Sequence, residues 1–192
     1  MLRRLLLLSP LALAACQRKL CAQDVDVHGL IPPLSFTMTD VNTGKQVTAA
    51  DFKGSVVLLY FGYTNCPDVC PTTLYNIQRV QAAMGKPAKK VKVLFITVDP
   101  DRDTPPLLTQ YTALFGTNVV GLRGSPNQLY SLARRYRVVF SVVKKPIYTV
   151  THSAAVYVFN ANGKPEFIIA GLSTVKPDIR GIAQDLRHVA AE

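Results

Sequence analysis

Two nearly continuous apolar runs constrain the fold of this chain more than any other feature. They are VVLLYF at residues 56–61 and VKVLFITV at residues 91–98. Runs of this length are typical of strands, and a strand without polar alternation is covered on both faces. The sequence therefore predicts two central strands in a sheet that has helices on both sides.

Helical and extended segments alternate along the chain around these runs. Residues 72–84 carry Leu74, Ile77 and Val80 at helical spacing, and Gly85 ends the segment. Further helices are expected over residues 104–115, 125–136 and 177–189, and further strands over residues 119–122, 138–143, 154–159 and 167–169. This order predicts the α/β class, with a central mixed β-sheet flanked by helices. An N-terminal β-hairpin extension is expected from residues 34–38 and 46–48.

The N-terminus has the pattern of a targeting segment. Arg3 and Arg4 precede an apolar run over residues 5–15, which is too short to span a bilayer. The run ends in LAAC, which resembles the lipobox of bacterial lipoproteins, in which the cysteine, here Cys16, carries the lipid. Ordinary cleavage, with Cys16 and Cys21 incidental, is the alternative; it would leave a soluble periplasmic protein.

These features divide the chain into three parts. We expect a signal peptide at residues 1–15, a tether at residues 16–30 and one folded domain at residues 31–192. A lipid on Cys16 would hold that domain on the periplasmic side of a bacterial membrane. The 22 Lys and Arg residues exceed the 12 Asp and Glu residues, but they are scattered along the chain, which argues against a nucleic-acid partner.

Cys66 and Cys70 are the only two cysteines inside the predicted domain, and they follow directly on a buried strand. A disulfide between them would close a very short loop and stabilise the fold little, which favours a chemical role. The start of a helix lowers the pKa of a thiol and favours the thiolate, which both binds metal and attacks disulfides. Two such sulfurs suit copper, and zinc less well, because structural zinc usually takes four protein ligands.

A third metal ligand would come from one of three histidines. His28 lies in the predicted tether, and His188 lies in the last turn of the final helix, where a cation suits the helix dipole. His152 lies just before a strand, a position at which an isolated histidine is more often a surface residue. Spacing alone therefore does not select a third ligand.

Four blocks of sequence resemble the Sco/SenC family. They are YFGYTNCPDVCPTTL at 60–74, VLFITVDPDRDTP at 93–105, GLRG at 121–124 and THSAAVYVFNANGK at 151–164. The resemblance extends over residues 30–188, nearly the whole domain. It implies a thioredoxin-like three-layer fold that binds one copper ion, Cu(I) or Cu(II), and delivers it to the CuA centre of cytochrome c oxidase. It also implies that Cys66, Cys70 and His152 are the copper ligands.

The resemblance also implies partners for this protein, and the sequence differs from the family pattern at two positions. The oxidase subunit that receives copper is the implied partner, with a thiol reductant or another copper carrier as a second possibility and the membrane reached through the N-terminal lipid. The family often has His or an aromatic residue where Asn65 stands, and usually has Asp where Thr151 stands. Loss of an acidic neighbour would change the basicity of His152 or the affinity for copper.

The acidic turn formed by Asp99, Asp101 and Asp103 has three interpretations. Its carboxylates could hold a hard cation or mark a docking surface, but we expect a solvated turn with a helix cap, because soft ligands lie nearby.

Two other functions compete with copper delivery. A thiol–disulfide reductase would use Cys66 and Cys70 as its redox-active pair and would not need His152. A thiol peroxidase would need an arginine beside Thr64, and this block has none.

Overall fold

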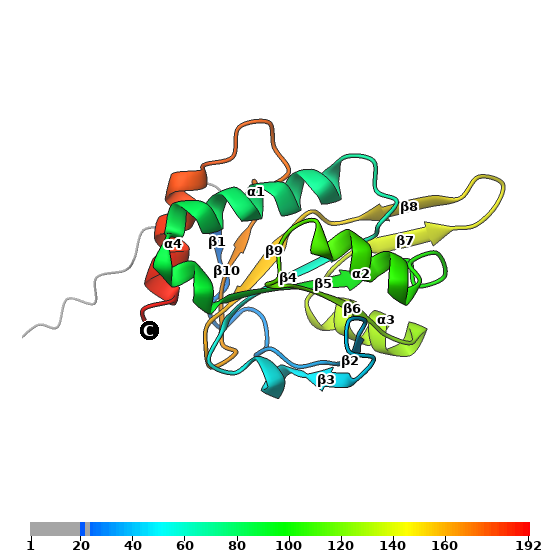
Figure 1. Cartoon of the computed structure of the whole chain (residues 1–192), viewed down its shortest axis with the longest axis horizontal. Coiled ribbons are helices and arrows are strands. Elements are labelled where there is room, and N and C mark those ends of the chain that lie inside the picture. Colours follow the sequence, from blue (N-terminus) through cyan, green and yellow to red (C-terminus); the bar gives the residue numbers. More distant parts are fainter. Residues whose placement is uncertain (1–19, 22–23) are drawn as a thin grey trace, which may run out of the picture.

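The structure, a computed structural model, describes residues 20–21 and 24–192. The predicted signal peptide and Cys16, with its predicted lipid, lie outside the described residues. The described chain forms one eight-stranded sheet, in the order β1-β10-β9-β4-β5-β6-β2-β3, and a separate sheet of two strands (Figure 1). In the part of the chain that the structure describes, no helix combines the length and apolar character needed to cross a membrane.

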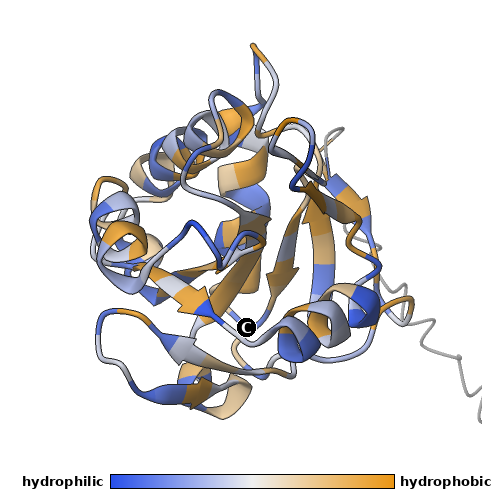
Figure 2. Cartoon of the chain, turned by 90° about the vertical axis from the view of Figure 1, so that its right-hand side faces the viewer, coloured by the Kyte–Doolittle hydropathy of each residue, from blue (hydrophilic) through white to orange (hydrophobic). Residues whose placement is uncertain are grey.

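The two apolar runs form the centre of the main sheet. They are β4 (Val56–Gly62) and β5 (Val91–Thr97), which pair in parallel along their whole length. All residues of β4 are buried, and the strands at the centre of the molecule are mostly hydrophobic (Figure 2). The strand β6 (Val119–Arg123) continues the parallel pairing beside β5. The prediction of central strands covered on both faces is confirmed.

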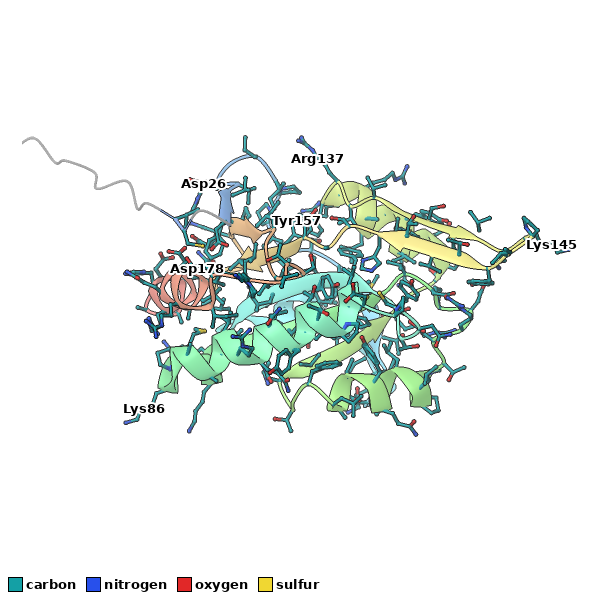
Figure 3. The ribbon with its side chains drawn as sticks, turned by 90° about the horizontal axis from the view of Figure 1, so that it is seen from above. Asp26, Lys86, Arg137, Lys145, Tyr157 and Asp178 are labelled. Atoms are coloured by element: carbon teal, nitrogen blue, oxygen red, sulfur yellow. The ribbon has the colours of Figure 1, made fainter. Side chains whose placement is uncertain are left out.

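Helices cover both faces of this sheet. Those joining the parallel strands are α1 (Val69–Met84) and α2 (Pro105–Ala113), and right-handed crossovers put both on one face (Figure 3). The helix α3 (Pro126–Arg135) lies on the opposite face, and α4 (Ile179–Val189) packs against α1. The three layers that the sequence predicts are therefore present.

Antiparallel strands extend the sheet at both edges. On one side β9 (Val156–Phe159) and β10 (Pro165–Ile169) follow β4. On the other side β2 (Thr37–Asp40) and β3 (Gln46–Thr48) form the predicted hairpin, and β2 pairs with β6. The hairpin is therefore part of the main sheet.

The folded domain begins earlier than the predicted boundary at residue 31. Within the predicted tether, β1 (Asp24–Asp26) pairs with β10 and forms the edge of the main sheet. The amide of Cys21 donates to the carboxylate of Asp185 on α4 at 2.8 Å. The sequence does not predict this strand because its residues are polar. An edge strand can form with polar residues, since it needs only backbone hydrogen bonds to one neighbour and one covered face.

The two strands outside the main sheet form a projecting hairpin. They are β7 (Phe140–Val143) and β8 (Thr149–His152), paired so that Phe140 lies opposite His152. Lys145 lies at the tip of this hairpin, far from the body of the molecule (Figure 3). The sequence predicts the first strand of this hairpin but not the second.

His28 links β1 to the rest of the sheet. Its Nδ1 lies 2.6 Å from a carboxylate oxygen of Asp26, and its Nε2 lies 3.0 Å from Glu166 on β10. Glu166 is buried and also accepts a hydrogen bond from Asn160 at 2.8 Å. The hydrogen bond to Asp26 is the main reason that the pKa of His28 is raised above 6.5, and the charge of Glu166 adds to it.

We expect the stability that His28 contributes to decline as the pH rises above about 6.5, because a raised pKa means that the protonated imidazole favours the folded state. The stabilisation by His28 is fully present below about pH 6.5, and it disappears as the pH rises through the raised pKa of His28. Because the side chain is 60% exposed, we expect less than about 1 kcal/mol. Urea unfolding of the wild type and of His28→Gln at several pH values measures it. A difference that stays constant from about pH 6 to about pH 9 would contradict this prediction.

Candidate metal centre

The two cysteines of the domain lie where β4 gives way to α1. Cys66 lies in the connecting loop, and Cys70 is the second residue of the helix. Pro71 follows in the first helical turn, where the missing amide hydrogen costs no intrahelical bond. The amide of Cys70 donates to the sulfur of Cys66 at 3.3 Å. A sulfur atom therefore occupies the position of a helix cap.

Gly62, the last residue of β4, makes room for this arrangement. A Cβ atom at this position would lie 2.9 Å from the sulfur of Cys70 and 2.7 Å from the ring of Phe95. Both contacts are shorter than side chains tolerate, and the surroundings are buried. The absence of a side chain at Gly62 thus lets the sulfur of Cys70 rest against the end of the central strand.

His152, the last residue of β8, approaches the sulfurs from the separate hairpin. Its Nε2 lies 3.1 Å from the sulfur of Cys70 and 4.0 Å from that of Cys66. The three potential ligand atoms all lie within 4.8 Å of one another. The structure therefore brings together the three residues that the resemblance selects, although 82 residues separate Cys70 from His152 in the sequence.

Hydrogen bonding and ring contacts orient the imidazole of His152. Its Nδ1 lies 2.9 Å from the backbone carbonyl of Ser153, which can only accept, so the proton is on Nδ1. The lone pair of Nε2 then faces the sulfurs. The ring of Tyr63 meets the imidazole edge to face at 5.6 Å, and that of Tyr60 at 6.1 Å. This is the tautomer that a metal-binding histidine requires.

The environment drives the pKa values of the two thiols in opposite directions. A hydrogen bond from the thiol of Cys70, together with backbone amides at the start of the helix, lowers the pKa of Cys66 to about 4. The same hydrogen bond, together with burial, raises the pKa of Cys70. Cys66 is therefore a thiolate at neutral pH, while Cys70 keeps its proton. Neither Cys66 nor Cys70 forms a disulfide in the structure.

The other two histidines lie elsewhere. His28 binds carboxylates at the edge strand, and His188 lies in the last turn of α4, as the sequence predicts. Asn65 and Thr151, the two residues that depart from the family pattern, are both exposed. They directly precede the candidate ligands Cys66 and His152. In the described chain a second group, Cys21, Asp24 and Asp185, also has ligand-type atoms within 4.8 Å.

The prediction of a solvated acidic turn is wrong for two of its three carboxylates. Asp103 is fully buried and accepts hydrogen bonds from the hydroxyls of Thr64 and Thr97 at 2.6 and 2.5 Å. It also accepts from the backbone amide of Thr64 at 3.1 Å. Burial raises the pKa of Asp103, and these hydrogen bonds oppose the rise. Because Thr64 lies two residues before Cys66, Asp103 anchors the loop that carries the thiolate.

Asp99 has an equivalent role toward the hairpin that carries His152. Its side chain is buried and accepts from Arg102 at 2.5 Å and from the hydroxyl of Tyr148 at 2.6 Å. The hydrogen bond to Asp99 raises the pKa of Tyr148 to about 12. Only Asp101 is exposed, and it pairs with Lys144 of the same hairpin. The acidic turn therefore contacts both the loop that carries Cys66 and the hairpin that carries His152, and these contacts bury the carboxylates of Asp99 and Asp103.

The sequence holds a signal for these supports that our interpretation did not use. The carboxyl ends of neighbouring parallel strands meet at one edge of a sheet, and the residues after them share a site. The acidic turn follows β5 just as the cysteine loop follows β4. That adjacency predicts contact between the two segments. No comparable signal marks Tyr63 or Tyr148.

Comparisons with known proteins agree with this arrangement. A mitochondrial SCO2 homolog of Bos taurus is 40% identical over 135 residues, which are 67% of this chain and 50% of that protein. The chain thus spans about half the length of that relative. The copper-bound structure of Bradyrhizobium japonicum ScoI is 39% identical and covers 81% of this chain and 98% of its own, with a TM-score of 0.69. Copper-bound yeast Sco1 is 28% identical and covers 84% of this chain and 90% of its own, with a TM-score of 0.72.

These likenesses confirm the thioredoxin-like α/β fold that the sequence resemblance implies. The SCO1/SenC family model matches residues 33–190, which include both cysteines, the acidic turn and His152. The chain belongs to the SCO1/SenC family.

Proposed function

We propose that this protein binds one copper ion through Cys66, Cys70 and His152 and delivers it to the CuA centre of cytochrome c oxidase. The convergence of two sulfurs and one imidazole nitrogen within 4.8 Å carries the proposal. Thiolate and imidazole together suit copper, and copper is here a cargo that the protein takes up and passes on.

The observed spacing of the donor atoms fits a single ion. Ligands at about 2.0–2.3 Å from a metal in a three-coordinate arrangement lie roughly 3.5–4 Å apart. The distances from Nε2 of His152 to the two sulfurs, 3.1 and 4.0 Å, bracket this range. Among the described residues this group has no fourth Cys, His, Asp or Glu, which disfavours structural zinc.

The fold gives the three donors unequal access to solvent. Cys70 is fully buried, Cys66 is 9% exposed, and His152 is partly exposed. A set of three protein ligands leaves one coordination position for a donor from a partner. Copper would pass by ligand exchange, in which a cysteine or histidine of the recipient binds before a ligand of this protein leaves.

The family supports copper as the cargo and the oxidase as the recipient. ScoI of Bradyrhizobium japonicum, ScoI of Arabidopsis thaliana and yeast Sco1 all have structures with copper bound. The sequence blocks that carry the family resemblance contain all three proposed ligands. A donor of copper, either another carrier or the free ion with a thiol reductant, is required upstream.

We expect the reduced wild-type domain to bind Cu(I) at one equivalent, because its three donors converge on one point. Replacement of Cys66 or Cys70 by Ser, or of His152 by Ala, removes a direct ligand. Each should weaken binding by more than the about 10- to 100-fold that indirect supports contribute. Competition with a chromophoric Cu(I) chelator measures the affinity.

His188→Ala is the matched control for these variants, because it removes a histidine of the last helical turn and should leave the affinity unchanged. Titration with Cu(II) offers a second measurement, since sulfur-to-copper charge-transfer bands should saturate at one equivalent. Full copper retention in the variant with both cysteines replaced would exclude this site.

A second function, thiol–disulfide reduction, is favoured by one observation. The more accessible thiol, Cys66, has the lowered pKa, whereas the buried Cys70 has the raised one. This division matches an attacking and a resolving thiol. The recipient cysteines of the oxidase must be reduced before they bind copper, so the same protein could supply their electrons.

The redox step balances as a two-electron exchange. The Cys66 thiolate attacks a disulfide of the target, forms a mixed disulfide and releases one target thiolate. Cys70 then loses its proton, for which Nε2 of His152 at 3.1 Å is the nearest base, and attacks the sulfur of Cys66. The second target thiolate leaves, a Cys66–Cys70 disulfide remains, and an external thiol reductant restores the pair.

The pH dependence of alkylation tests the division between the thiols. We expect iodoacetamide to modify Cys66 at a rate that is flat from about pH 8 to about pH 5 and that falls as the pH approaches its pKa of about 4. Cys70 should stay unmodified in the folded protein. Mass spectrometry of the two peptides reads both rates. Equal reactivity of the two thiols would contradict the assignment.

Complementation in cells separates the two functions. His152→Ala removes a copper ligand but leaves both thiols, so it should abolish oxidase assembly if copper delivery is the function. Assembly that survives His152→Ala but not Cys66→Ser would favour reduction.

We also propose that a lipid on Cys16 anchors the protein to the periplasmic side of the membrane. A SCO1/SenC family member from Bacillus anthracis is described as a lipoprotein, although at 24% identity the likeness shows only the fold. Cys16→Ser should abolish incorporation of a labelled fatty acid and release the protein to the soluble fraction. Cys21→Ser is the control and should change neither. Membrane association that persists without Cys16 would contradict the proposal.

A further inference from the structure

The metal centre is assembled from two parts of the fold that share no strand pairing. The cysteines belong to the end of β4 and the start of α1, within the main sheet and its helical layer. His152 belongs to β8, whose described strand partner is β7 alone. The hairpin of β7 and β8 projects from the body (Figure 1). Apart from the short link from His152 to β9, side-chain contacts therefore decide how far His152 lies from the sulfurs.

We infer that Asp99, Arg102 and Tyr148 are positioning residues of the metal centre, because they fasten the hairpin at the distance from which His152 reaches the sulfurs. The inference rests on the proposed function, since it gives these residues a role in copper binding. None of the three touches the proposed ion.

Tyr148 is held at both its hydroxyl and its ring. The hydroxyl donates to Asp99 at 2.6 Å, and the guanidinium of Arg102 lies over the ring at 3.9 Å from its centroid. Arg102 in turn donates to the second oxygen of Asp99 at 2.5 Å. Tyr148 directly precedes β8, so fixing it fixes the start of the strand that ends in His152.

Asp99 provides a rigid base for this contact. It is 1% exposed, lies two residues after the end of the central strand β5, and donates from its backbone amide to the hydroxyl oxygen of Thr97 at 3.1 Å. A buried carboxylate is costly unless its oxygens are paired, and here each oxygen has a named donor. Such an arrangement has one low-energy geometry, which suits it to set a distance.

The same turn fixes the other half of the site. Asp103 accepts hydrogen bonds from Thr64 in the cysteine loop, and its amide donates to the carbonyl of Asp99 at 2.9 Å. Tyr63, next to Thr64, donates from its hydroxyl to the carbonyl of Val150 in β8 at 3.3 Å. One short turn thus ties the cysteine loop and the histidine strand to a common support. A change at Tyr148 releases only the histidine side.

Tyr148→Phe in the full chain is the direct test, because it keeps the ring over Arg102 and removes only the hydrogen bond to Asp99. We expect about a 10-fold loss of Cu(I) affinity, the lower end of the range for indirect supports of metal ligands. Combined with His152→Ala, the same change should cost less than about 2-fold, because the residue it positions is gone.

The matched control is Lys144→Gln on the same hairpin. It breaks the exposed ion pair with Asp101 and should leave the affinity unchanged, because surface pairs contribute little. A readout without copper accompanies the affinities. In the metal-free protein, the ¹⁵N chemical shift of Nε2 of His152 should move in Tyr148→Phe, as contact with Cys70 weakens, and should not move in Lys144→Gln. Urea unfolding checks that each variant is folded.

The outcomes separate this inference from the proposed function. If His152→Ala binds copper as tightly as the wild type, His152 is not a ligand, and both proposals fail. If His152→Ala weakens binding but Tyr148→Phe does not, the proposed function stands and the positioning role is overturned. Equal losses from Tyr148→Phe with and without His152 would show a general effect on the fold, and would also overturn it.

Discussion

The parallel pairing of β4 with β5 is the constraint on which the rest of the structure depends. It runs without interruption from Val56 opposite Val91 to Gly62 opposite Thr97. Parallel neighbours end at the same edge of a sheet, so the segments that follow them emerge side by side. One segment carries the thiols and the other carries the carboxylates. The hydrogen bond from Thr64 to Asp103 is a direct result of this strand pairing.

Much of the fold follows from patterns that one sequence displays. The two apolar runs predict the central strands, and helical spacing with Pro and Gly at the ends predicts the four helices to within a few residues. The edge strand β1 escapes prediction because its residues are polar and its stability comes from backbone pairing with β10 and from His28. Local sequence carries little information of that kind.

The candidate site divides in the same way. Cys66 and Cys70 are foreseeable because their spacing and their place at the start of a helix both point to reactive thiols. His152 is selected only by family resemblance, since its approach to the sulfurs depends on the orientation of a separate hairpin. The carboxylates of Asp99 and Asp103 were expected in water, because a run of charges normally indicates a solvated surface. Their burial reflects long-range partners that no local pattern reveals.

The division of the three donors between two supports has a consequence for adaptation. The sulfur of Cys70 lies in the tightly packed centre of the domain, where a side chain at Gly62 would collide with it and with the ring of Phe95. The imidazole of His152 lies on the projecting hairpin of β7 and β8. Exposed residues of this hairpin, such as Thr151, are not constrained by packing. Affinity for the metal can therefore drift or be engineered through exposed residues of this hairpin, while the stability of the domain stays as it is.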